Sequence, residues 1–278
     1  MVRAMTAPVL TDTAALARNR ARAARAPALF MHELTADEVQ DRLTEVNRTF
    51  TNPAVVTPFP QVWEARMPGA RVVAEAEVLD LAPGSHDLVI HALALHWAND
   101  PVGQIIQCAR ALRPDGLFIA ALFGGQTLHE LRAALAQAES DVSGGLSPRV
   151  LPMGEIRDLG GLLQRAGLAL PVADSQSQRV SYRDVLHLMR DLRAMGESNA
   201  LAARLRRFTA RRVMGQAAVV YAAHFPDGEG RVRATFETVY LTGWKPHDSQ
   251  QKPLRPGSAA VRLADALNPP GGILPQGD

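Results

Sequence analysis

The sequence predicts an α/β fold in which a largely parallel sheet is covered by helices on both faces. Strand-like and helix-like segments alternate from residue 54 to residue 139. The strand segments are almost continuously apolar, as in "LFIAALF" (117–123), which is typical of strands buried on both faces. The connection from Ile90 to Leu117 also has the length of a crossover between two parallel strands.

The first helix predicted with a start signal spans residues 35–50. Thr35 and Glu38 form a capping-box pattern, and apolar residues follow at helical spacing. Three short strand candidates come next, at 54–57, 70–74 and 87–92.

The space between these strands is too short for a complete set of crossover helices. Ala54 and Leu88 are 34 positions apart, whereas a single strand–helix–strand unit takes roughly 30 residues. We therefore expect either that one helix is a single turn in "PQVWEARM" (60–67) and another is absent, or that the early part of the sheet is reduced.

The remaining elements follow the same logic. Pro101 suits the first turn of a helix, and "RPDG" (113–116) provides a turn before the strand 117–123. Helices are then expected at 126–139, 156–166, 182–195 and 199–223, and strands at 168–176 and 231–244.

Composition limits the classes of partner. Hydrophobic residues make up 47% of the chain, the net charge is +2, and no apolar run approaches the roughly 20 residues that span a bilayer. The arginines gather in two clusters: Arg18, Arg20, Arg22 and Arg25, and Arg204, Arg206, Arg207, Arg211 and Arg212. Because these clusters have no interleaved aromatic residues beyond Phe208, we predict solvated faces or docking surfaces and no nucleic-acid partner.

The sequence also suggests a compartment. The single cysteine, Cys108, excludes an intrachain disulfide and is expected in the core. The Arg-rich start is typical of a mitochondrial transit peptide, but the Ala- and Arg-rich composition favours a cytoplasmic bacterial protein. A eukaryotic source would place the protein in the mitochondrial matrix.

The stretch "HALALHWANDP" (91–101) follows a predicted strand. Ligands of open α/β sheets bind at the carboxyl ends of strands, so His91, Ala92, Leu93 and Trp97 are predicted to border a ligand crevice. The alternative places Trp97 in the core and makes Asp100 the cap of the next helix.

Several motifs resemble known proteins. The stretch from Asp87 to "LRPDG" (112–116) resembles the second half of class I S-adenosylmethionine-dependent methyltransferases. Residues 86–262 further resemble the methyltransferase-like assembly factor of respiratory complex I, a relative of the malonyl-carrier-protein methyltransferases of biotin synthesis. The motifs are "LHWANDP", "LFGGQTLHELR", "GGLSP", "RDLGGLLQRAG", "DLRAMGESNA" and "TGWKPHDSQ…RPGSA".

This resemblance implies a Rossmann-like methyltransferase sheet with a reduced N-terminal half and helical additions. It divides the chain into an Arg-rich arm (1–33), a methyltransferase-like domain (34–262) and a flexible tail (263–278). It also implies a complex I subunit, or another protein substrate, as partner. In the mitochondrial member of the family the activity is hydroxylation of an arginine.

The family's cofactor loop is missing from the chain. Methyltransferases of this class carry a Gly-rich loop after the first strand, whereas "PAVVTPFPQVW" (53–63) contains no glycine and includes Pro58, Phe59 and Pro60. S-adenosylmethionine is therefore a doubtful cofactor. If it binds, the resemblance makes Glu75 or Glu77 the partner of its ribose hydroxyls.

The remaining candidates belong to a substrate or partner surface. They are His96, Phe123, Gly124, Gly125, Trp244, Lys245 and His247. His91, His96 and Asp100 could supply the three ligands of an iron site, but they lie across a strand–helix corner, and we predict no metal.

Three functions are consistent with these features. The first is a complex I assembly protein that acts on or docks to a complex I subunit. The second is a non-catalytic binding module that has lost the cofactor. The third is an active methyltransferase on a small molecule or carrier protein, which the missing loop disfavours. The sequence does not decide between hydroxylation, methylation and no catalysis.

Overall fold

Six strands of the computed structural model, which describes residues 9–250, form one mixed sheet in the order β2-β1-β3-β4-β6-β5. β1 pairs in parallel with β2 and β3, and β3 pairs in parallel with β4, whereas β6 is antiparallel to β4 and β5. The predicted α/β fold is thereby confirmed. The strands are β1 Pro53–Val56, β2 Arg71–Val73, β3 His86–Ala92, β4 Leu112–Phe123, β5 Ala169–Tyr182 and β6 Val232–Trp244.

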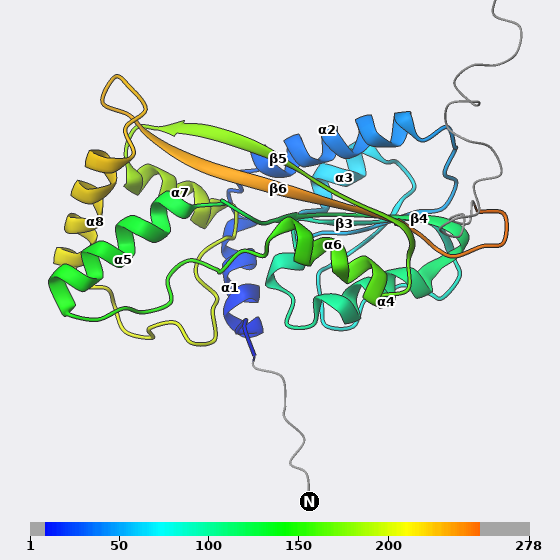
Figure 1. Ribbon diagram of the computed structural model, residues 1–278, viewed down its shortest axis with the longest axis horizontal. Coiled ribbons are helices and arrows are strands. Elements are labelled where there is room, and N and C mark those ends of the chain that lie inside the picture. Colours follow the sequence, from blue (N-terminus) through cyan, green and yellow to red (C-terminus); the bar gives the residue numbers. More distant parts are fainter. Residues whose placement is uncertain (1–8, 251–278) are drawn as a thin grey trace, which may run out of the picture. The chain divides into compact units, whose positions relative to one another are not determined.

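Helices cover both faces of the parallel part of this sheet, α2 and α3 on one face and α4 and α6 on the other (Figure 1). Leu88 and Ile90 of β3 face α2 and α3, whereas Val89 faces α4, as the alternation of a strand requires. The helices are α1 Thr13–Ala23, α2 Phe30–Glu45, α3 Pro60–Arg66, α4 Pro101–Ala111, α5 His129–Ser143, α6 Ile156–Arg165, α7 Val185–Ala194, α8 Arg211–His224 and the 3₁₀ helix η1 Leu95–Trp97.

The N-terminal half of the sheet is reduced, as predicted. α3 has 7 residues, β2 has 3, and no helix lies between β2 and β3 among the residues that the structure describes. The chain therefore passes from β1 to β3 with one short helix.

The structure corrects two predicted helix starts. α2 begins at Phe30, and Thr35 is buried inside it, so the capping-box interpretation is wrong. The cause is the apolar packing of Phe30 and Met31, which extends the helix toward the N-terminus. α8 begins at Arg211 rather than at residue 199, because residues 199–210 form turns and irregular structure.

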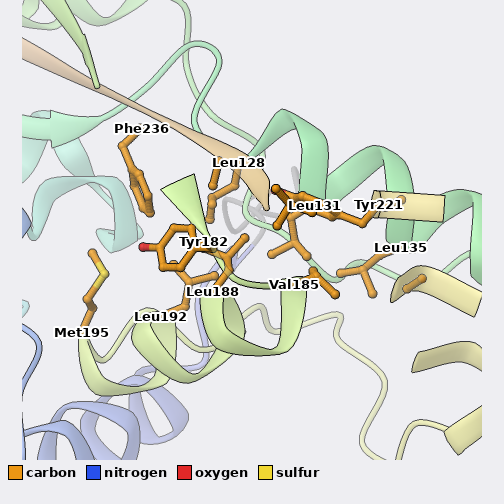
Figure 2. Close-up of a cluster of buried hydrophobic side chains, with 14 of the residues drawn as sticks. Leu128, Leu131, Leu135, Tyr182, Val185, Leu188, Leu192, Met195, Tyr221 and Phe236 are labelled. Atoms are coloured by element: carbon orange, nitrogen blue, oxygen red, sulfur yellow. The ribbon is translucent and has the colours of Figure 1, made fainter. Parts of the chain in front are cut away.

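The long antiparallel strands β5 and β6 extend beyond the parallel strands and support α5, α7 and α8 (Figure 1). Figure 2 shows the hydrophobic cluster there, in which Tyr182 and Phe236 of these strands meet Leu131, Leu188 and Tyr221 of the helices. α7 and α8 belong to the predicted helical additions, and α5 packs against α8 in the same cluster.

The first structural unit ends at Pro246, and the second begins at His247. The predicted tail (263–278) and the "RPGSA" motif lie outside the described residues. None of the helices within residues 9–250 has the length and apolarity needed to cross a membrane.

Candidate functional site

A cavity of about 760 Å³ lies at the carboxyl ends of β2 and β3. Four predicted cofactor residues line it: Glu75, Glu77, His91 and Trp97. α1 provides another part of the wall through Thr13, Leu16 and Ala17. The volume lies within the usual range for a small-molecule site.

His91 is a buried, neutral group in the wall of this cavity. Its Nε2 lies 3.4 Å from Oε1 of Gln104, whose amide nitrogen donates to the carbonyl oxygens of Ala76 (2.7 Å) and Glu77 (3.0 Å). Because the Gln104 oxygen faces the ring, we assign the proton to Nε2. Burial lowers the pKa of His91 to about 4. The ring is therefore uncharged at neutral pH.

Ala92 and Leu93 contribute differently from the prediction. Both are fully buried and pack in hydrophobic clusters rather than in the cavity wall. Leu93 has φ 47°, so the chain turns sharply there as it leaves β3. These two residues shape the strand end and present no side chain to the cavity.

The polar residues after Trp97 hold neighbouring elements. Asp100 caps α4 by accepting a hydrogen bond from the amide of Gly103 at 2.8 Å, as the alternative interpretation predicts. The Asn99 side chain accepts from the amides of Leu10 (2.9 Å) and Thr11 (2.8 Å) and thereby fixes the segment that leads into α1. Within residues 9–250, no three His, Cys, Asp or Glu side chains are placed to hold a metal ion.

A buried ion network joins α1 to the end of β3. The Arg20 guanidinium lies 2.8 Å from Glu75 and 2.8 Å from Glu197, and also donates to the carbonyl of Met195 at 3.0 Å. The second oxygen of Glu197 accepts from Trp97 Nε1 at 2.7 Å and lies 3.2 Å from His96 Nε2. Glu197 therefore connects α1 with η1.

The charges of this network are stabilised by one another. Burial alone would raise the pKa of Glu197, but Arg20 and His96 bring it well below its usual range. Burial opposes the charge on Arg20 as well, and the two carboxylates more than compensate, so its pKa is raised. Arg20 is only 8% exposed, so the prediction of a solvated face is wrong for this arginine.

The end of β1 is filled by apolar side chains. Phe59 is 1% exposed and its ring lies 4.7 Å from the ring of His32, edge to face. The guanidinium of Arg20 lies over the same Phe59 ring at 6.0 Å. α3 starts directly afterwards at Pro60.

This arrangement does not fit S-adenosylmethionine in the usual way. Pro58 and Pro60 have no amide hydrogen, and the Phe59 amide already donates to Thr57 Oγ1 at 3.2 Å. The bulk of Phe59 also occupies the place where a glycine loop would let the backbone approach the cofactor. We therefore derive no chemical step through this cofactor.

A second, smaller cavity of about 240 Å³ lies between the end of β4 and the added helices. Phe123 and Trp97 line it, and Glu197 reaches it from the network. His96 is buried between this wall and Glu197, with its ring 5.0 Å from that of Phe123. Trp97 borders both cavities.

The two glycines after β4 serve a close packing contact. Gly125 has φ 50°, and a Cβ there would lie 2.3 Å from the Glu237 carboxylate. A Cβ at Gly124 would meet the Val239 side chain at 2.7 Å. Both glycines therefore allow this turn to pack closely against β6.

The structure separates Trp244 and Lys245 from the other candidates. Trp244 pairs with Leu117 in the N-terminal half of β4, whereas the cavities lie toward the opposite, carboxyl ends of the parallel strands. The Trp244 ring faces the Arg48 guanidinium at 5.6 Å. His247 belongs to the second unit, where its Nδ1 lies 2.7 Å from Ser249 Oγ. A partner-surface role for these three residues stays a prediction.

Four residues of the site were not predicted as site residues from the sequence: Arg20, His32, Gln104 and Glu197. Glu197 lies in the quoted motif "DLRAMGESNA", and Arg20 in the first arginine cluster. Only the packing of α1 shows that they meet, because 177 positions separate them. His32 carried no motif signal.

The chain is similar to several known proteins. Residues 38–120 match the model of the methyltransferase domain family. The chain is 42% identical to the zebrafish (Danio rerio) arginine-hydroxylase NDUFAF5, mitochondrial, over 72% of this chain and 62% of that protein. It is 38% identical to the malonyl-[acyl-carrier protein] O-methyltransferase of Laribacter hongkongensis, over 72% of this chain and 64% of that protein. The YcgJ protein of Bacillus subtilis aligns at 12% identity with a TM-score of 0.47, over 78% and 100% of the two chains.

Over the matched residues, the chain is similar to the methyltransferase domain family and to a malonyl-[acyl-carrier protein] O-methyltransferase. It is also similar to the NDUFAF5 proteins, at 42% identity to the zebrafish member and 40% to the human one. The chain spans about three fifths of the length of these curated relatives.

Proposed function

We propose that this chain is a complex I assembly protein that acts on or docks to a subunit of complex I. The observation that carries the proposal is the 42% identity to a protein named arginine-hydroxylase NDUFAF5, which extends over 72% of the chain. The buried ion network supports it, because Arg20, Glu197 and Trp97 build a polar site that the closed end of β1 does not provide. We further propose that the protein works in the cytoplasm if its source is bacterial and in the mitochondrial matrix if its source is eukaryotic; the NDUFAF5 relatives are named as mitochondrial.

Deletion of the gene in the source organism tests this proposal. We expect loss of assembled complex I on native gels and loss of rotenone-sensitive NADH oxidation, with recovery when the wild-type gene is restored. Succinate dehydrogenase activity serves as the control, because it does not depend on complex I. Unchanged complex I in the deletion strain would overturn the proposal.

The non-catalytic binding module is a second candidate, favoured by the packing of Phe59 against His32 at the end of β1. Complementation with Glu197→Gln separates the two candidates, provided that the variant accumulates to the wild-type level. If the protein is a binding module that uses only its surface, the Glu197→Gln variant restores complex I. If the protein works through the buried site, this variant does not restore complex I.

The predicted surface at Trp244 is tested in the same strain. If this surface docks the partner, Trp244→Ala lowers complex I even though the residue lies far from the strand-end cavities. Normal complex I levels with Trp244→Ala would remove the docking role from this surface and leave the rest of the proposal intact.

A further inference from the structure

The side chain of Arg20 enters the molecule in an unusual setting for a residue of a terminal helix. Its guanidinium contacts Glu75 on one side and Glu197 on the other, each at 2.8 Å, and lies over the Phe59 ring. Two carboxylates and an aromatic face are the groups that recognise a guanidinium in proteins. The chain thus contains a complete guanidinium site, which one of its own arginines fills.

The backbone around this site is shaped to admit the arginine. Gly196 has φ 76°, and a Cβ there would lie 2.8 Å from Cδ of Arg20. A side chain at this position would therefore block the path of the arginine. Nη2 of Arg20 is buried and has no hydrogen-bond partner among the described residues, so the carboxylates do not saturate the guanidinium.

The helix that carries Arg20 is attached mainly by polar contacts. Asp12 pairs with Arg204 at 2.9 Å, Asn99 holds Thr11, and Asn19 donates to the carbonyl of Ser198 at 2.9 Å. Its buried apolar side chains are small apart from one leucine: Ala15, Leu16 and Ala23. A segment with few buried apolar groups opens at low free-energy cost.

We propose that Glu75, Glu197 and the Phe59 ring form a binding site for an arginine side chain of a partner protein, and that Arg20 occupies this site until the partner arginine displaces it. The inference rests on the proposed function, since a homologue is named for arginine hydroxylation. α1 forms part of the wall of the 760 Å³ cavity, so its displacement gives the incoming segment room beside the site.

Competition between Arg20 and an external arginine gives a direct test. The probe is an acetylated and amidated pentapeptide, Gly-Ala-Arg-Ala-Gly, with a citrulline peptide of the same size as the uncharged match. By calorimetry, we expect Arg20→Ala to bind the arginine peptide about tenfold or more tighter than the wild type, because the internal occupant is gone. Arg22→Ala is the matched control: Arg22 is exposed on the same helix, and its removal leaves the wild-type affinity unchanged.

Two results of the titration would overturn the proposal. One is equal affinity of wild type and folded Arg20→Ala for the arginine peptide. The other is equal binding of the arginine and citrulline peptides, which would show that charge recognition is absent. The gene deletion reports on complex I and not on peptide binding, so failure of the site and failure of the proposed function are told apart.

A measurement on the wild-type chain covers the case in which Arg20→Ala does not fold. Hydrogen exchange of the α1 amides is followed with each peptide at millimolar concentration. We expect faster exchange in α1 with the arginine peptide alone, since it competes for the site that retains the helix. Equal exchange with both peptides would contradict the displacement of α1.

Discussion

The carboxyl ends of β1 and β3 lie side by side in the sheet, yet the side chains at the two ends differ in polarity. β1 ends in prolines and Phe59, which is buried against His32. β3 ends at Ala92, next to His91, and leads into Trp97, which lines an open cavity and donates a hydrogen bond to the buried Glu197 carboxylate. The end of β1 is part of the hydrophobic core, whereas the end of β3 presents polar groups.

The difference shows that one strand end of a sheet can line a ligand-sized cavity while the neighbouring strand end is closed by apolar side chains. The order of strands in the sheet depends only on apolar strands and the connections between them. A cofactor cradle needs in addition free amide groups and a backbone without bulk. At the end of β3, Glu197 from the segment after α7 accepts a hydrogen bond from Trp97 and thereby fixes the polar groups there.

The largest expected effect comes from Glu197→Gln at the polar end. Removing one partner of a buried ion network leaves Arg20 undercompensated, and we expect a loss of about 3–5 kcal/mol in the free energy of unfolding. Urea denaturation measures it. Asp80→Asn, the same change in the exposed Arg71–Asp80 pair, should cost no more than about 1 kcal/mol. Similar losses for both variants would contradict the role of burial.

The pH dependence of the free energy of unfolding depends on one buried histidine at each strand end, His32 beside the end of β1 and His91 at the end of β3. Burial lowers the pKa of His32 to about 3 and that of His91 to about 4, while the unfolded chain binds these protons near pH 6.5. The unfolded state therefore binds more protons as the pH falls from 6.5 toward 4. Stability is present above pH 6.5 and is lost below it, by up to about 1.4 kcal/mol per pH unit for each ring.

Urea unfolding at several pH values between 4.5 and 7.5 checks this prediction. His91→Gln and His32→Gln should each flatten the pH dependence of the free energy of unfolding. If stability is equal at pH 7.5 and pH 4.5, the two rings are not buried in the neutral form.

A smaller loss is expected from Trp97→Phe. A phenyl ring replaces the indole, so an aromatic ring remains, but the hydrogen bond from Nε1 to the Glu197 carboxylate is removed. Losing this bond to a charged acceptor costs about 1.5–3 kcal/mol. Trp244→Phe is the matched control, because its ring contact with Arg48 survives the change, and we expect a loss below about 1 kcal/mol. Thermal unfolding of both variants gives the comparison. An equal loss for both would remove the special role of Trp97.

The smallest effect concerns the cap of α4. Asp100→Ala removes the acceptor for the Gly103 amide and should cost about 1 kcal/mol, whereas Asp100→Asn keeps the cap and should stay near the wild type. Urea denaturation resolves this difference. A wild-type stability for Asp100→Ala would show that the cap contributes nothing measurable.

Much of the fold was predictable because it depends on local patterns. The apolar strands, Pro101 at the start of α4 and the short α3 follow from residue order alone. The start of α2 was not predictable in this way, because a strong local signal at Thr35 was overridden by the packing of Phe30. Local capping preference is weak beside tertiary burial.

The candidate site was predictable only in part. His91, Glu75 and Trp97 do line one cavity, as expected from their places at strand ends. Arg20 and Glu197 are 177 positions apart and meet only when α1 packs on the segment after α7. Trp244 also stands at a strand end, as the last residue of β6, but β6 is antiparallel to β4, so this end falls at the opposite edge of the sheet.

We infer that the end of β1 is closed to S-adenosylmethionine. Calorimetric titration of the folded full chain with S-adenosylmethionine, with S-adenosylhomocysteine as companion ligand, tests it most directly. We predict no saturable heat and no thermal shift at ligand concentrations up to about 1 mM, which corresponds to a binding free energy weaker than about −4 kcal/mol. Saturable binding with a Kd of about 1 μM would contradict the account and show that a loop without glycine still holds the cofactor.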